Sequence, residues 1–415
     1  MNSPARSGTI DHLAFGGSGV MRAEGMVIFV PFAAEQDHLT VNIVKQKKNY
    51  AEGQIASIDQ ASPGRISPRC PHFFSCRGCQ FQHLKYEEQL KAKQRFVEDA
   101  LHRQAALKVS VEPIIPSPQV WNYRKHIRLN LKILRNGFEA GYIGFDSSFL
   151  SVSQCYLFHK EQDLLFEQIK ETLLRLSNQG IKEGSLKICK NNNQYLFAFS
   201  FFPYLPKNSS EIFSSFPFPV ILQSPRQRES FGVSEQYFSL LGLDFFYSPY
   251  SFLQNNLEQS ENLYKAILSQ TTANTVLDFY CGIGITTLLL AQRGVSVIGV
   301  EANAEAIRLA KRNQQHNQIM KAQFLCSSVE NVSVPYAPCI LVNPPRTGLS
   351  PLVLNKILEM KPQEILYVSC MPSTLARDLK KIVAAGYAIR YAQPFDMFPQ
   401  TTHVETFVKL TLEFF

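Results

Sequence analysis

The sequence has no uninterrupted apolar run long enough to span a bilayer, and its opening stretch MNSPARSGTI lacks the pattern of a signal peptide. We therefore expect a cytoplasmic protein with no membrane partner. Charged residues are few, at 18%, while apolar residues make up 45%. This composition excludes a disordered chain. A chain of 415 residues is too long for one ordinary core, so two or three domains are expected.

Neither sign of charge dominates, because the formal net charge is only +8. This excess is compatible with a polyanionic partner but does not establish one. Basic residues gather at KQKK (45–48) and YRKHIRLNLK (123–132). Taken alone, each cluster is better explained as a solvated face.

The cysteines do not form the pattern of a disulfide framework. Nine cysteines in a chain with cytosolic features favour metal binding or catalysis. Cys70, Cys76 and Cys79 are bunched as C-x5-C-x2-C, and the others are scattered. Among the scattered ones, Cys189, Cys281, Cys326 and Cys339 are interpreted as packing residues. Thiolates suit either zinc or an iron–sulfur cluster, and the spacing alone leaves both open.

The sequence divides into three regions. Residues 1–65 contain short β-rich runs, which predict an OB-like barrel of the kind often used to hold nucleic acid. Residues 66–240 begin with the cysteine cluster and combine a helical segment with β-like runs, which predicts a central α+β domain. Residues 241–415 alternate strands and helices, which predicts a doubly wound, Rossmann-like α/β sheet.

Ligands of doubly wound sheets bind beyond the carboxyl ends of the strands. In this chain those ends are DFYCGIG, VEAN, VNPPR and VSC. Cys370 ends the apolar run EILYVSC, so we expect it to face the ligand crevice. A packed core thiol would be the ordinary interpretation of a cysteine elsewhere.

The loop LDFYCGIG lacks the third glycine of a dinucleotide fingerprint and the Lys-Ser/Thr pair of a triphosphate loop. Gly282 and Gly284 still allow the backbone to approach a ligand closely. Glu301 ends the next strand, about 20 residues on, where an acid can bind ribose hydroxyls. Together with Asp278, these residues predict an adenosine-type site, with S-adenosylmethionine as the better ligand.

With these segments in place, the chain resembles the RNA uracil-5-methyltransferase family over almost its whole length. It is most similar to the 23S ribosomal RNA branch, which carries an N-terminal TRAM domain and an iron–sulfur cluster. The resemblance is carried by FGGSGVMRAEGMVIFVPFA, CPHFFSCRGCQFQHL, SFLQNN, LDFYCGIG, VNPPRTGL, YVSCMPSTLARDL and FDMFPQTTHVE. It implies S-adenosylmethionine-dependent methylation of uracil C5 in RNA, with a 23S rRNA loop as the partner. Nothing in the sequence demands an oligomer, so a monomer is expected.

The resemblance also assigns site residues. The nucleophile falls on Cys370, within Ser-Cys-x-Pro, and the general base on Glu405, within HVE. The expected cofactor contacts are Gln254, Tyr280, Gly282, Gly284, Glu301 and Asn343. The expected ligands of a [4Fe–4S] cluster, with a structural or RNA-positioning role, are Cys70, Cys76, Cys79 and Cys155. Departures from the family pattern are Asn343 for Asp, Ile285 for Asn, Met371 for Asn and Gln400 for His.

The implied chemistry explains these residue types. Addition of a thiolate at C6 of uracil makes C5 nucleophilic, and a base must then remove the C5 proton. We expect a helix beginning near STLARDL to lower the pKa of Cys370. His403 either orients the base or is a packed ring.

The target uridine must be flipped out of folded RNA. Aromatic candidates near it are Phe398, Tyr280 and Phe395, each of which is more simply a core residue. The barrel and the basic strand around Arg124, Lys125 and Arg128 are expected to hold the RNA backbone.

Two other functions remain open at this point. Asn343-Pro-Pro is similar to the motif of amino-group methyltransferases, which need no cysteine. A non-catalytic RNA-binding assembly factor could keep the same fold. Cys370 and Glu405 argue against both.

Overall fold

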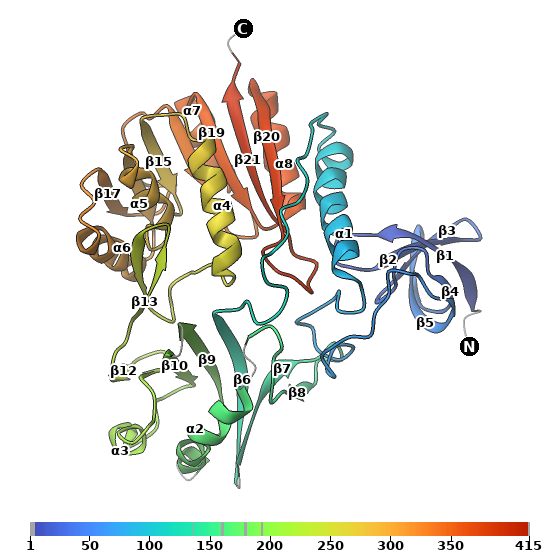
Figure 1. Ribbon diagram of the computed structural model, residues 1–415, viewed down its shortest axis with the longest axis horizontal. Helices are drawn as coiled ribbons and strands as arrows, with labels where there is room; N and C mark the ends of the chain where they lie inside the picture. Colours follow the sequence, from blue (N-terminus) through green and yellow to red (C-terminus); the bar gives the residue numbers. More distant parts are fainter. Residues whose placement is uncertain (1–4, 136, 159–161, 178–180, 192–193, 414–415) are drawn as a thin grey trace.

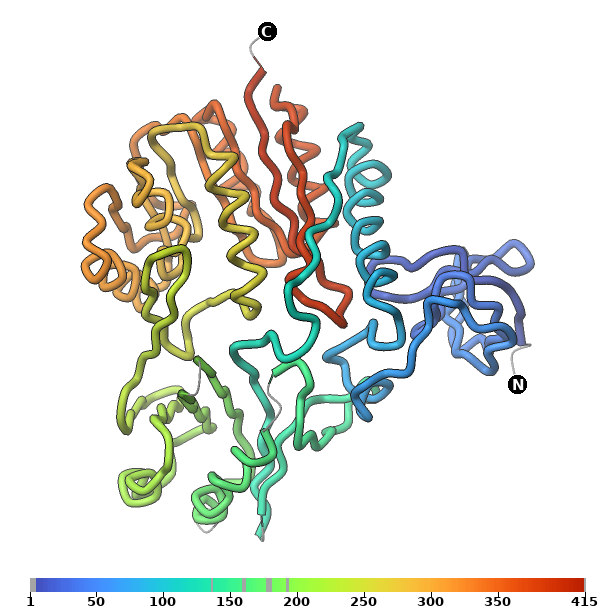
Figure 2. The backbone as a smooth tube through the Cα atoms, viewed as in Figure 1, coloured from blue at the N-terminus to red at the C-terminus, as the bar shows by residue number. Residues whose placement is uncertain are grey.

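The computed structural model describes residues 5–135, 137–158, 162–177, 181–191 and 194–413. The chain runs from a small barrel, through a central sheet, into a larger α/β sheet at the C-terminal end (Figures 1 and 2). Among the described residues, no helix is both long and apolar enough to cross a membrane.

The N-terminal strands close into a barrel, which confirms the OB-like prediction. The strands are β1 (Arg6–Leu13), β2 (Gly19–Ala23), β3 (Met26–Val30), β4 (His38–Gln46) and β5 (Tyr50–Gln60), in the order β1-β2-β3-β5-β4. Apolar side chains such as Ile10, Met21 and Val41 fill the interior. The linker that follows is tied back to the barrel, because Arg65 Nη2 lies 2.6 Å from Oδ2 of the buried Asp37.

Helix α1 (Tyr86–Asp99) continues into one π-helical turn, η1 (Ala100–Gln104). The sequence placed this helix in the central region, yet it lies beside β20 of the C-terminal sheet (Figure 1). Its apolar residues Val97 and Leu101 belong to the same core as that sheet. The segment before α1, which carries three cysteines, is thereby held against the C-terminal domain.

The central sheet has the order β12-β11-β10-β9-β6-β7-β8. Its strands are β6 (His126–Leu134), β7 (Gly137–Ile143), β8 (Phe149–Ser151), β9 (Glu183–Asn191), β10 (Gln194–Phe201), β11 (Val220–Gln223) and β12 (Arg228–Phe231). Strand β6 alternates buried apolar and exposed polar residues, which is the pattern of a sheet covered on one face. Helices α2 (Gln162–Ser177) and α3 (Ser209–Phe213) contribute to the core on the covered face.

The C-terminal sheet has the order β17-β16-β15-β18-β19-β21-β20. Its strands are β15 (Thr275–Phe279), β16 (Ser296–Glu301), β17 (Ala322–Cys326), β18 (Cys339–Val342), β19 (Glu364–Ser369), β20 (Tyr387–Phe395) and β21 (Glu405–Leu412). The first five in this order are parallel, and β21 runs antiparallel to both of its neighbours. This arrangement confirms the predicted Rossmann-like methyltransferase fold.

Helices cover both faces of this sheet. They are α4 (Leu257–Gln270), α5 (Ile285–Gln292), α6 (Ala304–His316), α7 (Pro351–Met360) and α8 (Pro372–Ala384). Leu263, Leu288 and Leu309 place α4, α5 and α6 in one core, whereas Val353 and Leu375 place α7 and α8 in the other, with α1. Two separate cores on one sheet are the mark of a doubly wound domain.

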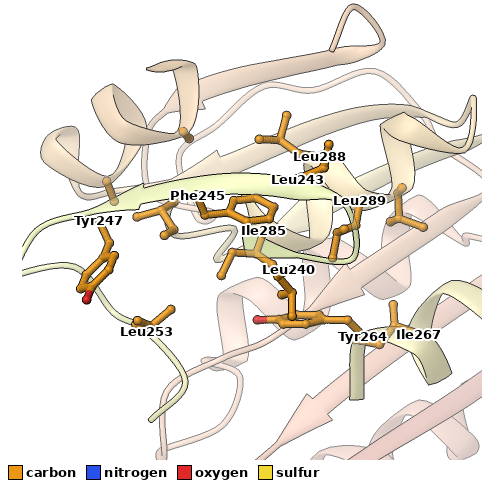
Figure 3. Close-up of a cluster of buried hydrophobic side chains, with 14 of the residues drawn as sticks. Leu240, Leu243, Phe245, Tyr247, Leu253, Tyr264, Ile267, Ile285, Leu288 and Leu289 are labelled. Carbon is orange, nitrogen blue, oxygen red and sulfur yellow. The ribbon is translucent and has the colours of Figure 1, made fainter. Parts of the chain in front are cut away.

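A hairpin of β13 (Gln236–Leu240) and β14 (Leu243–Tyr247) crosses the boundary predicted near residue 240. Figure 3 shows Leu240, Leu243 and Phe245 of the hairpin gathered with Leu288 of α5 and Tyr264 of α4. The hairpin therefore packs on the C-terminal domain, and burial of these apolar side chains is what fixes it there.

Candidate active site

A cavity of about 520 Å³ lies at the carboxyl ends of the C-terminal sheet. Seven of the eight predicted catalytic and cofactor residues line it: Gln254, Tyr280, Gly282, Glu301, Asn343, Cys370 and Glu405. The remaining one, Gly284, is absent from the lining. Residues from the carboxyl ends of four strands, from the start of β21 and from the segment before α4 therefore meet at one place.

The two loop glycines, Gly282 and Gly284, have different structural roles. Gly282 has φ +56°, and a Cβ added there would meet no atom within 4 Å. Gly284 has φ +83°, and its Cβ would lie 2.7 Å from Cζ of Phe324. Gly282 thus leaves open space beside the cavity, whereas Gly284 allows the start of α5 to pack closely on the sheet.

Asp278 likewise supports the fold rather than lining the cavity. It is buried, and its Oδ2 accepts a hydrogen bond of 2.6 Å from the Thr287 hydroxyl. Burial raises the pKa of Asp278 to about 7. The carboxyl group fastens β15 to α5 just below the glycine loop.

The loop beside the cavity is held in an unusual conformation. Tyr280 has φ +64°, and its N–H donates to Val300 O at 2.9 Å. Non-glycine residues in this region are strained, and such strain gathers at ligand sites. Glu301 Oε2 accepts the Gly282 N–H at 3.3 Å, so the carboxylate stands directly against the loop. An acceptor, an open backbone and an aromatic ring together fit the ribose and base of S-adenosylmethionine.

The segment after β18 is rigid and carries Arg346, which the sequence analysis did not single out. Buried Asp378 of α8 accepts the Leu349 N–H and the Tyr367 hydroxyl, both at 2.8 Å. Arg346 lines the cavity, and its Nη2 lies 3.4 Å from Nε2 of His403. Its position directly after Pro-Pro at a strand end was the signal available in the sequence.

Strand pairing places Cys370 and Glu405 at the same edge of the sheet. Ser369, the last residue of β19, pairs with Thr406 of antiparallel β21. Burial, followed by the charge of Glu405, raises the pKa of Cys370 to about 11, while Arg346 acts in the opposite direction. The expectation of a lowered pKa is therefore wrong, because desolvation and the charge of Glu405 outweigh the effect of Arg346.

Glu405 is only 2% exposed, and burial raises its pKa to about 8, with Arg346 again opposing the shift. A carboxyl group with this pKa can give or take a proton near neutral pH. Burial, followed by the charge of Arg346, lowers the pKa of His403 to about 4, so its ring is neutral. A neutral ring facing the guanidinium can accept a hydrogen bond from it at Nε2.

Among the aromatic candidates, Phe398 and Tyr280 line the cavity, whereas Phe395 is a fully buried core residue. His126 and Phe252 also line it, and the sequence analysis assigned neither of them to the site. Phe252 is 70% exposed, so its ring stands at the mouth.

The loop between β20 and β21, residues 396–404, is anchored by α1. Lys93 Nζ lies 2.5 Å from Asp396 Oδ1, and both side chains are fully buried. Lys93 also donates to Phe398 O at 2.9 Å, and the Tyr86 hydroxyl donates to Asp396 Oδ2 at 2.8 Å. A buried ion pair with these extra hydrogen bonds holds the loop in one position.

Gln400 joins the same loop to the cysteine segment. Its carbonyl accepts the N–H groups of Gln80 and Phe81, which directly follow Cys79, at 3.1 and 3.0 Å. Its own N–H donates to Gln89 Oε1 of α1 at 2.9 Å. The residue that departs from the family pattern here is therefore buried and structural.

Comparisons with known proteins agree with this geometry. The family described as tRNA (Uracil-5-)-methyltransferase matches residues 335–413, and the methyltransferase small domain matches residues 242–360. A protein of Protochlamydia amoebophila named as an uncharacterized RNA methyltransferase is 39% identical over 97% of this chain and 96% of its own. A protein of Halalkalibacterium halodurans with the same description is 34% identical over 98% of this chain and 96% of its own.

Among solved structures, the Pyrococcus abyssi tRNA (uracil-54, C5)-methyltransferase in complex with S-adenosyl-L-homocysteine is similar to the whole chain. Its TM-score is 0.77 at 27% identity, and the match covers 98% of this chain and 100% of that one. This chain belongs to the RNA uracil-5-methyltransferase family. It is an S-adenosylmethionine-dependent RNA methyltransferase.

The four cysteines of this methyltransferase that were expected to bind a cluster line a second, small cavity of about 50 Å³. Burial raises the pKa of Cys70 and Cys76, and that of Cys79 to about 12. Among the described residues, no three His, Cys, Asp or Glu side chains are close enough to hold one metal ion. Four thiols lining one cavity are a donor set that either a zinc ion or an iron–sulfur cluster can take.

Arg124 also lines the cysteine cavity, and its Nε is buried without a hydrogen-bond partner in the described chain. The prediction that Arg124 holds RNA is therefore wrong, because its guanidinium faces the thiols. A buried cation beside four thiolates would offset their negative charge. Lys125 is paired with Glu258 at 2.9 Å, and Arg128 is exposed.

The cysteines that the sequence analysis assigned to packing differ in exposure. Cys189 and Cys339 are buried, and Cys281 is half-buried. Cys326 is exposed, so its assignment as a packing residue is wrong.

Proposed function

We propose that this enzyme methylates C5 of a uracil in RNA, with Cys370 as the nucleophile and Glu405 as the base. The observation that carries the proposal is one cavity that holds both a thiol and a buried carboxyl group with a pKa of about 8. Amino-group methylation needs neither group, and a binding-only protein has no use for a proton acceptor at this site.

In the first step, the Cys370 sulfur forms a bond to C6 of the uracil, and the electron pair of the 5,6 double bond moves to the C4 oxygen as an enolate. S-adenosylmethionine, when bound, would supply a methyl group: the enolate pair would form the new bond between C5 and the methyl carbon, and the sulfonium sulfur would keep the pair of the broken sulfur–methyl bond and leave as S-adenosylhomocysteine. Glu405 then takes the proton from C5, and the electron pair of that C–H bond restores the double bond. The bond between sulfur and C6 breaks, and Cys370 leaves as a thiolate.

Arg346 provides the positive charge that this sequence of steps needs. Its guanidinium lowers the pKa of both Cys370 and Glu405, which are otherwise raised by burial. It therefore favours the thiolate before attack and the carboxylate before proton removal. A cation held by a rigid loop costs no reorganisation as charge develops.

The residues that would hold S-adenosylmethionine are Gln254, Tyr280, Gly282, Glu301 and Asn343. Asn343 replaces the acid of the family pattern, but an amide can both donate and accept hydrogen bonds. The neutral side chain also avoids placing another carboxylate beside Glu405.

We also propose that Cys70, Cys76, Cys79 and Cys155 hold a [4Fe–4S] cluster with a structural role. The same sequence resemblance supports a 23S rRNA loop as the substrate. The solved Pyrococcus abyssi relative is named for tRNA uracil-54, so tRNA is the alternative substrate. Mapping 5-methyluridine in rRNA and tRNA from cells with and without this enzyme separates the two.

The mechanism is tested with RNA that contains 5-fluorouridine, incubated with the anaerobically purified enzyme and S-adenosylmethionine. Fluorine cannot be removed as a proton, so the enzyme should stall as a denaturant-resistant adduct with RNA. Cys370→Ala should abolish the adduct, whereas a control variant of exposed Cys326 should retain it. If the wild-type enzyme with verified cofactor binding forms no adduct on total RNA, uracil-5 methylation by this thiol is wrong.

A further inference from the structure

The central sheet has one face covered by α2 and α3 and a second face that is only partly covered. On that second face Cys189, Ala198 and Ile221 pack in the core of the C-terminal domain, and the rest is open. On β6, Ile127, Leu129 and Leu131 point into the core under α2, while Arg128 and Lys132 are exposed on the other side. We call this exposed side of β6, β9, β10 and β11 the open face. An exposed sheet face is either solvated or bound by a partner. Four further observations favour a bound partner here.

First, polar side chains run across the open face in register. Arg128 of β6 pairs with Lys187 of β9, so two cations stand side by side. In the adjacent row Ser185 of β9 pairs with Ser200 of β10, which pairs with Gln223 of β11. The face therefore presents the exposed guanidinium of Arg128 next to a row of hydroxyl and amide groups, while the partly buried Lys187 Nζ donates to Pro249 O at 2.5 Å.

Second, the open face is hollowed, and one of its hollows adjoins the active site. One hollow has a volume of about 760 Å³ and the next about 450 Å³, and both are lined by Arg128, Ser185 and Gln223. His126 lines the second hollow and also the catalytic cavity. The second hollow therefore adjoins, at His126, the cavity that holds Cys370.

Third, the charge of the lining matches a polyanion. Among the described residues that line the two hollows, Arg128, Lys132 and Lys187 are cationic, and Glu183 is the one carboxylate. Burial, followed by the charges of Lys187 and Arg124, lowers the pKa of His126 to about 3, so the passage to the cavity is neutral.

Fourth, the lining includes groups that suit nucleobases. Phe202 is 79% exposed, and Lys132 Nζ lies 4.4 Å from the centre of the Phe149 ring. Exposed rings next to cations are the surface on which unpaired bases stack. Gln223 Oε1 is buried without a hydrogen-bond partner in the described chain, so a donor on a ligand would satisfy it.

We propose that the open face binds the unpaired nucleotides that flank the target uridine and directs that uridine past His126 into the cavity. This inference rests on the proposed function, since it concerns the same RNA. Single-stranded RNA is favoured over duplex because flat sheet faces with exposed rings bind unstacked bases, whereas duplex RNA is recognised through its backbone and minor groove. A protein partner would not explain why the second hollow adjoins the catalytic cavity at His126.

The test uses a double variant, Arg128→Gln with Lys132→Gln, which removes two exposed cations of the open face. Its matched control is Lys170→Gln with Arg175→Gln, two cations exposed on α2, which covers the opposite face of the same sheet. The probes are fluorescent single-stranded oligouridines of about 15 and about 4 nucleotides, which bracket a small binding site. Binding is measured without S-adenosylmethionine over a series of salt concentrations.

For single strands, each phosphate contact contributes about 0.7 to the slope of log K against log salt. Loss of two contacts should therefore reduce the slope by about 1.4 and weaken binding of the longer probe roughly tenfold at about 0.15 M salt. The control variant should bind like the wild type. For the short probe, the open-face variant should differ little from the wild type, because few flanking nucleotides remain.

If the open-face variant bound the longer probe as tightly as the wild type does, the inference would be overturned. Equal losses in both double variants would also overturn it, since they would reflect net charge alone. Unfolding in urea verifies that both variants are folded. Failure of the proposed function is seen separately, as absence of the 5-fluorouridine adduct in the wild-type enzyme.

Discussion

Replacing Glu405 with glutamine should make the folded enzyme more stable than the wild type, by a margin that grows as pH rises. The pKa of Glu405 rises from 4.5 in an exposed chain to about 8 in the folded state, because burial disfavours its charged form. Its stabilising contribution is therefore fully present below about pH 4.5 and is lost as pH rises to about 8. At about 1.4 kcal/mol per pH unit, the loss over these roughly 3.5 units is on the order of 5 kcal/mol above pH 8. Glutamine keeps the shape of the side chain without this penalty.

Urea unfolding of cofactor-free wild type and Glu405→Gln, at several pH values between about 5 and 9, measures the effect. The advantage of the variant should grow with pH and level off above about 8. Glu359→Gln, on the exposed surface of α7, is the control and should change stability by less than about 0.5 kcal/mol at every pH. A stability difference between Glu405→Gln and wild type that does not vary with pH would refute the argument that Glu405 is held protonated by burial.

Three further predictions follow from the same structure. Arg346→Gln should slow formation of the 5-fluorouridine adduct about tenfold at neutral pH, because the guanidinium lowers the pKa of Cys370. The slowing should be smaller at higher pH, and quench-flow rates measured across pH check this. Lys93→Met should cost about 3 to 5 kcal/mol in urea unfolding, since it leaves Asp396 buried without its partner, and a second change, Asp396→Asn, should recover part of the loss. Gly284→Ala should cost about 1 to 3 kcal/mol in urea unfolding, with S-adenosylmethionine affinity of the folded variant unchanged by calorimetry.

Much of the fold follows from local pattern. The alternation of strands and helices in the C-terminal region, and the β-rich runs of the first region, were sufficient to predict a Rossmann-like domain and a barrel. The position of α1 was not predictable in this way. Its apolar face could pack on any sheet, and only three-dimensional contact with β20 and α8 shows that it belongs to the C-terminal core.

The candidate site was likewise predictable from the sequence only in part. Strand ends gather at one edge of a parallel sheet, so motifs at those ends could be placed together from the sequence: Cys370, Glu301 and Asn343 do share one cavity. The electrostatics could not be predicted, because they depend on groups distant in sequence. Burial and Glu405 together reverse the expected shift in the pKa of Cys370.

The order of strands and helices thus established the ligand crevice of a doubly wound sheet, and the resemblance of whole motifs to a family identified a thiol and a carboxyl group within it. Burial and long-range contact established which cation faces the thiol, that Arg124 turns toward the cysteines and that Gln400 links them to the catalytic loop. The physical reason is that sequence pattern reflects backbone periodicity. Desolvation and charge pairing depend instead on distances between side chains that the folded chain alone brings together.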